Sequence, residues 1–419
     1  MLSTGTSPRV TVADTVDAVE QLREVWTSLP VPDIDAQIDY FLTVTRSGPK
    51  VLTPYVIHAR LADGRDLLAV ARVELRSVPL SVGYRAVAEP LARHLVLAFG
   101  GLLGVTGPED VRLLVGLLRD ALRAGVADVL LLAKVAPDGE AAREVERTVG
   151  WLWRSHGQRP TGRWTAELPG SLDGFLAHRS AKTRQKLRTK DRKLEKKYGD
   201  RLRLRRLGDP ADLDSLARDM AAVGVRTYQH GLGVAFCGEG LDLALMRTAV
   251  QHGWFRSWLL YLDDRPVAFW AGTLWNGTFS PVTPGFDPAL SQDSIGHYTM
   301  FRMVEDLCAD PEAVRLDFGH GDARYKTEFA RAETHEVDLL IWRRSPRAAA
   351  LNLALAGQAR ANAWGRMLAS RTSLGHRVKR RWRQHLQRCC QTGEDVGTGC
   401  SAPPDTPRAP DAPTAPTVR

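Results

Sequence analysis

Cysteine is scarce in this chain, and its few cysteines do not have the spacing of a metal site. Among 419 residues there are five, namely Cys237, Cys308, Cys389, Cys390 and Cys400. The two adjacent cysteines are not a zinc pair, because zinc ligands are separated by at least two residues. A chain with neither a disulfide framework nor a metal motif is typical of a reducing compartment. We therefore predict a cytoplasmic protein without a metal.

Long apolar runs are also absent from the sequence. No stretch reaches the roughly 20 apolar residues that a helix needs to cross a bilayer. The first six residues, MLSTGT, have neither the basic start nor the apolar segment of a secretory signal. Hydrophobic residues make up 44% and charged residues 25% of the chain, as in globular proteins. For 419 residues we expect two or three domains.

Positive charge is concentrated in two segments. Residues 179–206 contain 14 Lys or Arg and 3 Asp or Glu, whereas residues 343–388 contain 12 Lys or Arg and no acidic residue. Because the net charge of the whole chain is only +9, the remainder is acidic. Charge localised in this way indicates anionic partners. The first segment predicts a basic helical arm over about 179–198 that contacts phosphates; the alternative is an arm whose charge only aids solubility.

The expected elements follow the same order in both halves of the chain. Each half has helices, an antiparallel meander, one further helix and then a strand. Tight turns are expected at Asp63-Gly64 and Asn276-Gly277. The helix after each meander is expected at about 108–124 and at 295–309. We interpret this order as two copies of one α/β unit, with chance similarity as the alternative.

Apolar runs place the strands of these two halves. A strand is expected over 86–98, and buried strands are expected at 129–133 and 313–318. Residues 346–388 are rich in Ala, Leu and Arg and have a helical pattern. From residue 389 to 419, Pro, Thr, Ala, Gly and Asp dominate, so we expect a disordered tail.

Residues that carry chemistry crowd into one turn of the second half. Residues 317–326, DFGHGDARYK, follow the last expected strand directly. Glycine permits left-handed backbone and close approach to a ligand, and α/β folds keep their chemistry at strand ends. The alternative is a plain strand-to-helix turn with Asp322 as its N-cap. That alternative does not account for Tyr325 and Lys326.

This motif is one of five that together resemble a known family. The others, in chain order, are the basic helix at 184–195, TYQHGLG at 227–233, RPVAFW at 265–270 and GFDP at 285–288. As a set they resemble the acetyltransferase-like GNAT domain of bacterial exopolysaccharide and cellulose biosynthesis clusters. That group is related to the Fem-type peptidoglycan aminoacyltransferases. The resemblance covers about residues 165–342.

The resemblance implies a tandem GNAT architecture that catalyses acyl transfer. Its fold class is α/β, with mixed, mainly antiparallel central sheets flanked by helices, a basic helical arm and a basic helical C-terminal extension. We place an N-terminal GNAT-like domain at 1–165, the acyltransferase domain at 166–345, the helical extension at 346–388 and the tail at 389–419.

An acyl donor is expected at the start of the helix at 295–309. Backbone N–H groups at a helix N-terminus bind the pyrophosphate of acetyl-CoA, because they point at the anion along the helix dipole. The candidate donor-binding residues are Ser294, Gly296, His297, Gly319 and Gly321. The usual GNAT loop has a basic residue and several close glycines, whereas here Asp293 is acidic and one glycine stands alone. An ordinary N-cap at this place is the alternative.

Acyl transfer also needs a proton acceptor and a group that stabilises the oxyanion. We predict Asp322 or His320 as the acceptor; a zinc site on these two side chains would lack further ligands. In Fem-type enzymes a lysine near this place contacts the acyl donor, and Lys326 is its match. We predict that Lys326, Tyr325 or a backbone N–H near Gly321 stabilises the oxyanion. The alternative for the lysine is a solvated surface residue.

The acceptor is expected beside the loop at 226–233 and nearby aromatic residues. The candidate acceptor-binding residues are Arg226, Tyr228, His230 and Trp270. Aromatic rings stack on sugars, but they are as readily part of a core, since the chain has 11 tryptophans.

Three functions follow from these residues. The leading prediction is N-acetyl transfer from acetyl-CoA to an amino sugar or related amine in polysaccharide or cell-envelope synthesis. The alternative enzyme is a Fem-like transferase that uses aminoacyl-tRNA, favoured by the basic arm and the unusual donor loop. The third is a catalytically inactive GNAT fold that binds anionic partners. Residues 343–388, with Trp382 among basic residues, also suggest peripheral contact with an anionic inner membrane face.

Overall fold

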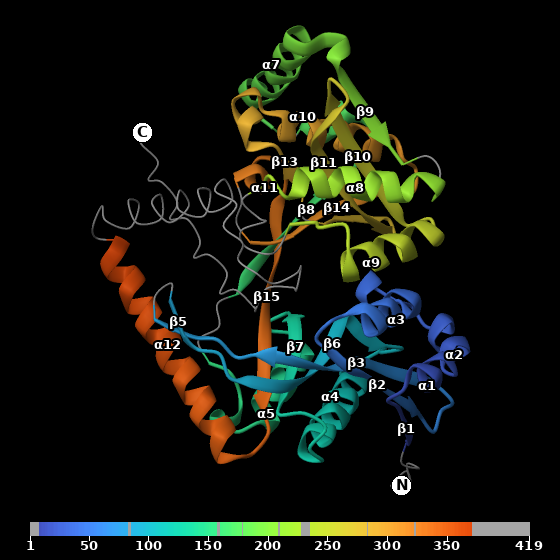
Figure 1. The fold of residues 1–419 in the computed structure, drawn as a ribbon. Coiled ribbons are helices and arrows are strands. Elements are labelled where there is room, and N and C mark those ends of the chain that lie inside the picture. Colours follow the sequence, from blue (N-terminus) through green and yellow to red (C-terminus); the bar gives the residue numbers. More distant parts are fainter. Residues whose placement is uncertain are drawn as a thin grey trace. The chain divides into compact units, whose positions relative to one another are not determined.

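The chain groups into two compact units, which we describe separately. The computed structural model describes residues 8–82, 85–156, 160–177, 179–207, 210–227, 235–282, 284–321 and 324–370. The first unit holds the described residues up to Gly162 and again from Thr334 onward, and the second unit holds Arg163–Glu333 (Figure 1).

The first unit is built on a sheet with the strand order β1-β2-β3-β6-β7-β15. These strands are β1 (Arg9–Ala13), β2 (Val51–Arg60), β3 (Asp66–Ser77), β6 (Leu91–Leu103), β7 (Val129–Val135) and β15 (Arg331–Trp342). Neighbours are antiparallel, except that β6 and β7 are parallel. The predicted turn at Asp63-Gly64 joins β2 to β3, and Gly64 has a φ of +89°, a region that favours glycine.

Helices cover both faces of this sheet. One face carries α1 (Val16–Glu20), α2 (Arg23–Ser28) and α3 (Ile38–Ser47), and the other carries α4 (Pro108–Arg123) and α5 (Glu140–Thr148). Successive residues of a strand point to opposite faces. In β3, Leu68 and Val70 therefore join the core under α1–α3, while Ala69 and Ala71 join the core under α4. Burial on both faces explains why β3 has an almost continuous apolar sequence.

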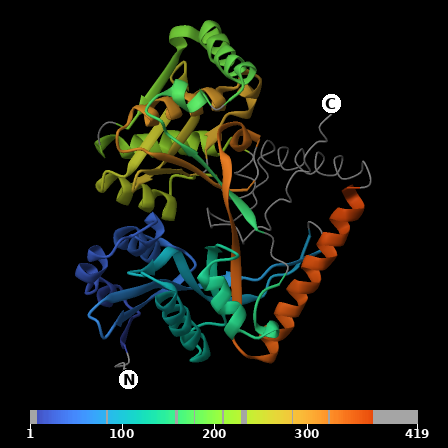
Figure 2. The ribbon, with the colours of Figure 1, turned by 180° about the vertical axis from the view of Figure 1, so that it is seen from behind.

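A long helix, α12 (Pro346–Ser370), lies against the hairpin of β4 (Leu80–Val82) and β5 (Arg85–Ala88) (Figures 1 and 2). Its Gln358 accepts a hydrogen bond from the Ser81 backbone N–H at 2.8 Å and donates one to Ser81 Oγ at 3.0 Å. The predicted helical extension is thus described as far as Ser370, and residues 371–419 lie outside the described part. None of the described helices is both long and apolar enough to cross a bilayer.

The second unit has a sheet with the strand order β8-β14-β12-β11-β10-β9, and β13 pairs with β11. These strands are β8 (Thr161–Glu167), β9 (Leu202–Arg206), β10 (Phe255–Leu262), β11 (Arg265–Trp275), β12 (Thr278–Pro281), β13 (Gly285–Phe286) and β14 (Arg315–His320). Neighbours are antiparallel, except that β12 and β14 are parallel. The predicted turn at Asn276-Gly277 joins β11 to β12.

Helices also cover both faces of the second sheet. One face carries α6 (Leu172–Ala177), α7 (Ala181–Tyr198) and α10 (Ile295–Ala309), and the other carries α8 (Leu213–Gly224) and α9 (Gly240–Gln251). In β11, Trp270 and Leu274 belong to the core under α10, whereas Phe269 and Ala271 belong to the core under α8. The short helix α11 (Arg324–Phe329) follows β14.

Both units contain the same crossover. Helix α4 joins the parallel neighbours β6 and β7, and α10 joins the parallel neighbours β12 and β14. Each crossover interrupts an otherwise antiparallel sheet. The predicted fold class, a tandem α/β arrangement with mixed, mainly antiparallel sheets flanked by helices, is therefore confirmed.

Two details differ from the sequence-based expectations. The strand expected over 86–98 is two strands, β5 and β6, and β6 continues past an irregularity at Gly100, where φ is +69°. Residues up to 345 were expected in the second domain, yet β15 from Thr334 onward groups with the first unit, because its apolar end pairs with β7 from Val337 to Trp342. The remaining domain boundaries stay predictions.

Candidate active site

The predicted motif lies where β14 ends. Asp317 is 6% exposed and accepts hydrogen bonds from Arg163 Nε of β8 at 2.7 Å and from the Gly319 backbone N–H at 2.8 Å. Gly319 and Gly321 have φ values of +69° and +87°, which side-chain-bearing residues rarely adopt. The carboxylate and the two glycines together bend the chain sharply after the strand.

Lys326 closes this corner from α11. This lysine is 7% exposed, and its Nζ donates a hydrogen bond of 2.6 Å to the His320 carbonyl oxygen. Lysine is among the residues least often buried without a partner. The alternative of a solvated surface lysine therefore does not describe this residue, whereas its role at an oxyanion stays a prediction.

Several predicted residues lie outside the described part of the chain. Asp322, Tyr228 and His230 are not described, and of Tyr325 only the backbone, within α11, is described. The proposed proton acceptor at 322 and the proposed acceptor contacts at 228 and 230 thus stay predictions.

The start of α10 is the predicted donor site. Ser294 precedes the helix with a φ of +60°, and its side chain does not cap the helix. The Ser294 carbonyl oxygen accepts hydrogen bonds from the His297 and Tyr298 backbone N–H groups at 3.0 and 3.1 Å, while its side chain caps none of the first N–H groups of α10. A helix N-terminus presents such groups, together with the positive end of the helix dipole, to an anion.

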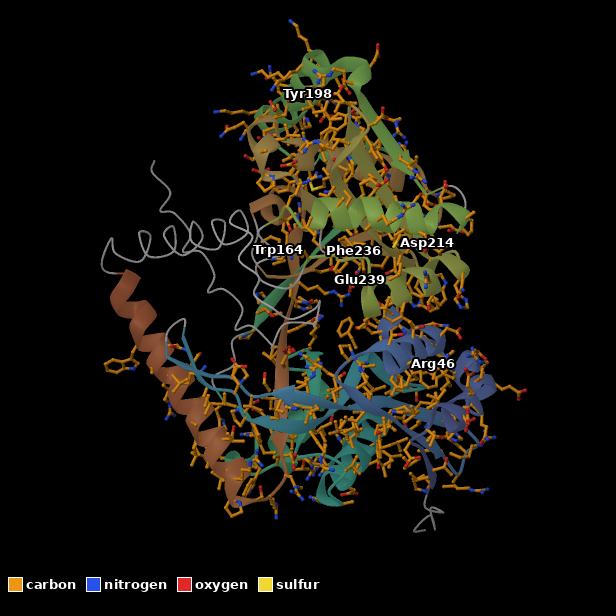
Figure 3. The ribbon with its side chains drawn as sticks, viewed as in Figure 1. Arg46, Trp164, Tyr198, Asp214, Phe236 and Glu239 are labelled. Atoms are coloured by element: carbon orange, nitrogen blue, oxygen red, sulfur yellow. The ribbon has the colours of Figure 1, made fainter. Side chains whose placement is uncertain are left out.

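The loop before α10 is tied to the end of α7. Asp293 accepts hydrogen bonds from Lys197 Nζ at 2.6 Å and from the Tyr198 hydroxyl at 2.8 Å. Tyr198, the last residue of α7, is labelled in Figure 3. The hydrogen bond from Lys197, and then that from Tyr198, hold the pKa of Asp293 below its ordinary value. The acidic residue that departs from the usual GNAT loop is thus paired with two residues of the basic arm.

Gly296 has a packing role in the first turn of α10. A Cβ atom at this position would lie 3.1 Å from the Phe286 ring, so a larger residue would require that ring, which is 37% exposed, or α10 to shift by a few tenths of an ångström. The Gly296 carbonyl also accepts a hydrogen bond from Trp270 Nε1 at 3.3 Å. Trp270 itself is 5% exposed and packs edge-to-face on Phe318 of β14, with ring centroids 6.2 Å apart. Its contacts are those of a core residue, and a contact with an acceptor stays a prediction.

His297, one residue further on, faces α11. Its Nε2 lies 3.3 Å from Glu328 Oε2, and its ring packs edge-to-face on Phe329 at 5.2 Å. Burial is the main cause that lowers the pKa of His297, and Lys190 lowers it further, while Glu328 opposes the shift. A neutral imidazole at neutral pH can accept a proton. The pair of His297 and Glu328 is therefore a candidate for acid–base chemistry.

The sequence did not indicate Glu328 as part of the site. Glu328 is the second residue after Lys326. An acidic residue just beyond the motif is the sequence signal by which it could have been identified. Helix α11 contributes both residues, one towards the end of β14 and one towards the start of α10. The predicted oxyanion donor and the predicted donor-binding helix thus share one short element.

Arg226 is engaged within its own unit. Its guanidinium donates to the Pro266 carbonyl oxygen at 3.1 Å and lies 3.7 Å from Asp287, which is also paired with Arg265 at 2.8 Å. Asp287 in turn accepts from the Ala289 N–H at 3.0 Å. These contacts hold the ends of β11 and β13, and a role for Arg226 in binding the acceptor stays a prediction.

The basic arm is packed on one side and exposed on the other. Leu187, Asp191 and Leu194 on α7 are 3%, 8% and 3% exposed, and their spacing places them on one helix face. Asp191 pairs with Arg302 of α10. The opposite face exposes Lys182, Lys186, Arg188, Arg192, Lys193, Lys196 and Lys197. The arm therefore presents a row of positive charge to solvent while staying attached to α10.

Among the described residues, no group of three or more His, Cys, Asp or Glu side chains is placed to hold a metal ion. The chemistry available to these residues is proton transfer by an imidazole, charge stabilisation by an ammonium group and anion binding at a helix N-terminus.

Comparison with protein families gives one match. Residues 181–327 match a family model described as "Acetyltransferase (GNAT) domain". The match covers about a third of the chain and includes α7, α10, β14 and Lys326. The second unit therefore carries a GNAT-type acetyltransferase domain, and the protein is a transferase. A comparison with curated protein sequences finds no significant match.

Several solved structures are similar to this chain at low sequence identity. FemX is 11% identical, with 82% of this chain and 100% of that chain covered and a TM-score of 0.54. A tandem GNAT protein from the clavulanic acid biosynthesis pathway is 13% identical, with 80% and 98% covered and a TM-score of 0.46. The C-terminal domain of a putative lysylphosphatidylglycerol synthetase from Agrobacterium fabrum is also 13% identical, with 80% and 96% covered and a TM-score of 0.47. The similarity to FemX concerns the fold alone.

Proposed function

We propose that this protein transfers the acetyl group of acetyl-CoA to the amino group of an amino sugar or a related amine, in polysaccharide or cell-envelope synthesis. One observation carries the proposal: the GNAT match over residues 181–327 includes the corner where Lys326 is buried beside the end of β14. The amine and the polysaccharide setting come from the motif resemblance described above.

The donor is bound at the start of α10. The Gly296 backbone N–H and the positive end of the helix lie beside the pyrophosphate of acetyl-CoA. Ser294 and His297 flank this position, and their own N–H groups donate to the carbonyl oxygens of Ser291 and Ser294. Gly319 and Gly321 keep side chains away from the end of β14, so that the backbone approaches the thioester. We assign no metal to this step.

The transfer requires a nucleophilic amine and a stabilised oxyanion. The amine nitrogen attacks the thioester carbonyl carbon, and the carbonyl oxygen becomes an oxyanion that Lys326, with Tyr325, stabilises. The C–S bond then breaks, and the CoA thiolate takes up a proton as it leaves. The proton that the amine loses goes to a base, which is His297 supported by Glu328, or His320 or Asp322 as the sequence predicts.

The donor can be tested by ligand-induced stabilisation. We expect acetyl-CoA to raise the melting temperature in a concentration-dependent way, because a ligand that binds only the folded state stabilises it. Release of free CoA thiol in the presence of amino sugars would then report turnover. Absence of both effects with acetyl-CoA, and a shift with aminoacyl-tRNA instead, would contradict the acetyl-CoA proposal.

A Fem-like reaction with aminoacyl-tRNA is the second candidate. Two observations favour it, namely the fold similarity to FemX and the exposed row of lysine and arginine side chains on α7. Contacts with phosphates make binding strongly dependent on salt. We expect this alternative to show loss of label from charged tRNA, with affinity falling steeply between about 50 and 200 mM salt.

A catalytically inactive GNAT fold that binds anionic partners is the third candidate. Under this alternative, Lys326→Ala and Asp322→Asn leave the cellular function intact.

Contact with an anionic membrane is compatible with this alternative and with both enzymatic ones. The described part of α12 contains no acidic residue, and it exposes Leu353 at 48% and Trp364 at 67%. Binding to vesicles with and without anionic lipid tests this contact.

A further inference from the structure

An ion pair in the second unit lies at the start of the corner that leads to Lys326. Arg163 of β8 contacts the Asp317 carboxylate of β14 with two nitrogens, Nε at 2.7 Å and Nη2 at 2.5 Å, and both reach the same oxygen, Oδ2. The side chain of Asp317 is 7% exposed and that of Arg163 is 22% exposed. The pair is therefore largely shielded from solvent, and hydrogen bonds between charged groups are strong in such surroundings.

The other oxygen of this carboxylate holds the bend after β14. Asp317 Oδ1 accepts a hydrogen bond from the Gly319 backbone N–H at 2.8 Å, a local bond by which aspartate side chains define turns. Gly319 has a φ of +69°, and the pairing of β14 with β8 becomes irregular between Asp317 and His320. Such irregularities redirect side chains and are frequent beside active sites. Because Arg163 fixes the carboxylate, it also fixes the acceptor of the Gly319 N–H.

The bend in turn determines where Lys326 is held. His320 follows Gly319 directly, and its carbonyl oxygen accepts the hydrogen bond of 2.6 Å from Lys326 Nζ. The direction of this carbonyl depends on the backbone conformation of the bend. Arg163 is thus connected to Lys326 through a continuous series of contacts, although the two residues lie far apart in the sequence.

The corner is also held from the opposite side of the strand. Phe318, between Asp317 and Gly319, is 6% exposed, and its ring packs edge-to-face on Trp270. Successive side chains of a strand point to opposite faces, so Asp317 and Phe318 act on different sides of β14. The ion pair therefore supports the side that the core does not.

A purely structural role accounts for only part of this arrangement. Strands β8 and β14 are already paired from Arg315 to Asp317, so the ion pair is not needed to align them. It lies instead where the pairing becomes irregular, and its carboxylate binds the segment that leads to Lys326.

We propose that Arg163 is a positioning residue for acyl transfer, which acts through Asp317 to hold Lys326 where its ammonium group meets the oxyanion. This inference rests on the function proposed above. A donor to an oxyanion contributes most when it is held in place before the reaction. Without this support Lys326 is less well placed in the transition state, which lowers kcat and leaves the binding of acetyl-CoA unchanged.

Steady-state kinetics of the full-length protein with acetyl-CoA and glucosamine test this role. Arg163→Gln should lower kcat about tenfold to a hundredfold, because a displacement of about 1 Å can cost about a hundredfold in rate, while KM for acetyl-CoA should stay the same. Arg163→Lys keeps the charge and should recover part of the loss. In a Lys326→Met background, Arg163→Gln should cause no further loss, since residues that act as a unit have non-additive effects.

Asp317→Asn is a second variant, in case the loss of Arg163 leaves a buried carboxylate that prevents folding. Its amide oxygen can still accept the Gly319 N–H, while the ion pair is lost. It should also lower kcat, and again add nothing to the effect of Lys326→Met.

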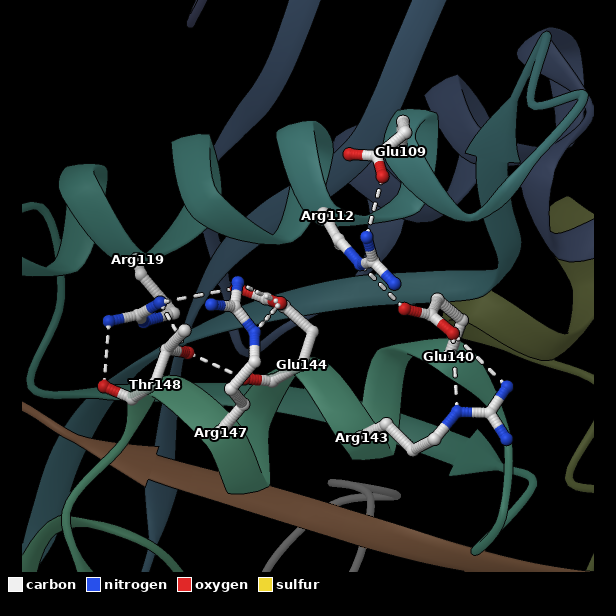
Figure 4. A network of polar contacts seen from close by, with 8 residues as sticks. All are labelled: Glu109, Arg112, Arg119, Glu140, Arg143, Glu144, Arg147 and Thr148. Atoms are coloured by element: carbon white, nitrogen blue, oxygen red, sulfur yellow. Dashed lines mark hydrogen bonds and ion pairs between the residues drawn. The ribbon is translucent and has the colours of Figure 1, made fainter.

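The matched control is Arg147→Gln in the first unit, which should keep the native kcat. Arg147 likewise contacts one oxygen of a buried carboxylate, that of Glu144, with Nε at 3.1 Å and Nη2 at 2.7 Å (Figure 4). Additive losses from Arg163→Gln and Lys326→Met, or a native kcat in both Arg163→Gln and Asp317→Asn, would overturn the positioning role alone. Absence of turnover by the native protein would overturn the proposed function, and this role with it.

Discussion

Asp191 is a buried carboxyl group on the face of α7 that packs against α10. It offers the sharpest test of the interactions that attach the basic arm to α10. It is 8% exposed and pairs with Arg302, which also bonds Glu305 at 2.7 Å. Burial is the dominant effect and raises the pKa of Asp191 from 3.8 to about 6, although Arg302 acts in the opposite direction. The ionised form is therefore disfavoured in the folded protein relative to the unfolded chain.

The sign of the resulting pH dependence follows from proton binding. Between pH 4 and 6 the folded protein holds a proton on Asp191 that the unfolded chain has released. The free energy of unfolding due to this group is thus largest below about pH 4 and is lost as the pH rises through 6. A shift of about two pKa units corresponds to roughly 3 kcal/mol. Asp191→Asn, a neutral residue of the same shape, should therefore raise the free energy of unfolding at pH 7.5 by up to about 3 kcal/mol.

Urea unfolding of the native protein and of Asp191→Asn at several values between pH 4 and 8 measures this difference. The two proteins should converge near pH 4, and the variant should become the more stable above pH 6. The control Asp200→Asn changes an exposed carboxyl just after α7 and should show no such crossover. If Asp191→Asn is instead destabilised by about 3 kcal/mol at pH 7.5, then the ion pair with Arg302 outweighs burial and the reasoning is refuted.

Three further predictions concern activity and the first unit. Lys326→Met should lower kcat/KM for acyl transfer about a hundredfold or more, while the control Lys50→Met in the first unit should leave it unchanged. If Lys326→Met keeps the native kcat/KM, then Lys326 takes no part in the reaction. Glu328→Gln removes a contact that raises the pKa of His297, so the acidic limb of the pH–rate profile should move to lower pH. If this limb stays at the same pH, then a residue other than His297 is the base. Asp110 in the first unit bonds Arg65 at 2.8 Å, which holds the pKa of this carboxyl at about 2. Its stabilising effect is present above pH 4 and lost towards pH 2, so in denaturant titrations Asp110→Asn should cost about 1–3 kcal/mol at pH 7 and little at pH 2.

Much of the fold could be predicted because local signals and tertiary structure agree. Helix α10 spans the residues expected for it, since its apolar positions recur with helical spacing and face the sheet. The turns at Asp63-Gly64 and Asn276-Gly277 depend on left-handed backbone that these residue types tolerate. Strand β15 was harder to assign, because its partner β7 lies some two hundred residues away and pairing at such distance leaves no local trace.

The candidate site could be predicted only in outline. The glycines and Lys326 stand in one short motif, so their proximity at the end of β14 follows from sequence alone. The contact between His297 and Glu328 depends on how α10 and α11 pack, which neither segment indicates by itself. The same limit applies to Trp270, since an aromatic residue in a strand has the same sequence pattern whether it faces a ligand or, as here, Phe318 and α10.

Strand β15 has a practical consequence for dividing this chain. Its residues from Thr334 complete the first unit, although most of the second unit precedes them in the sequence. A fragment ending at residue 165 would leave one edge of β7 bare, and such edges recruit strands from other molecules. We expect this fragment to aggregate when expressed alone, and to become soluble when a peptide covering 334–342 is supplied in trans.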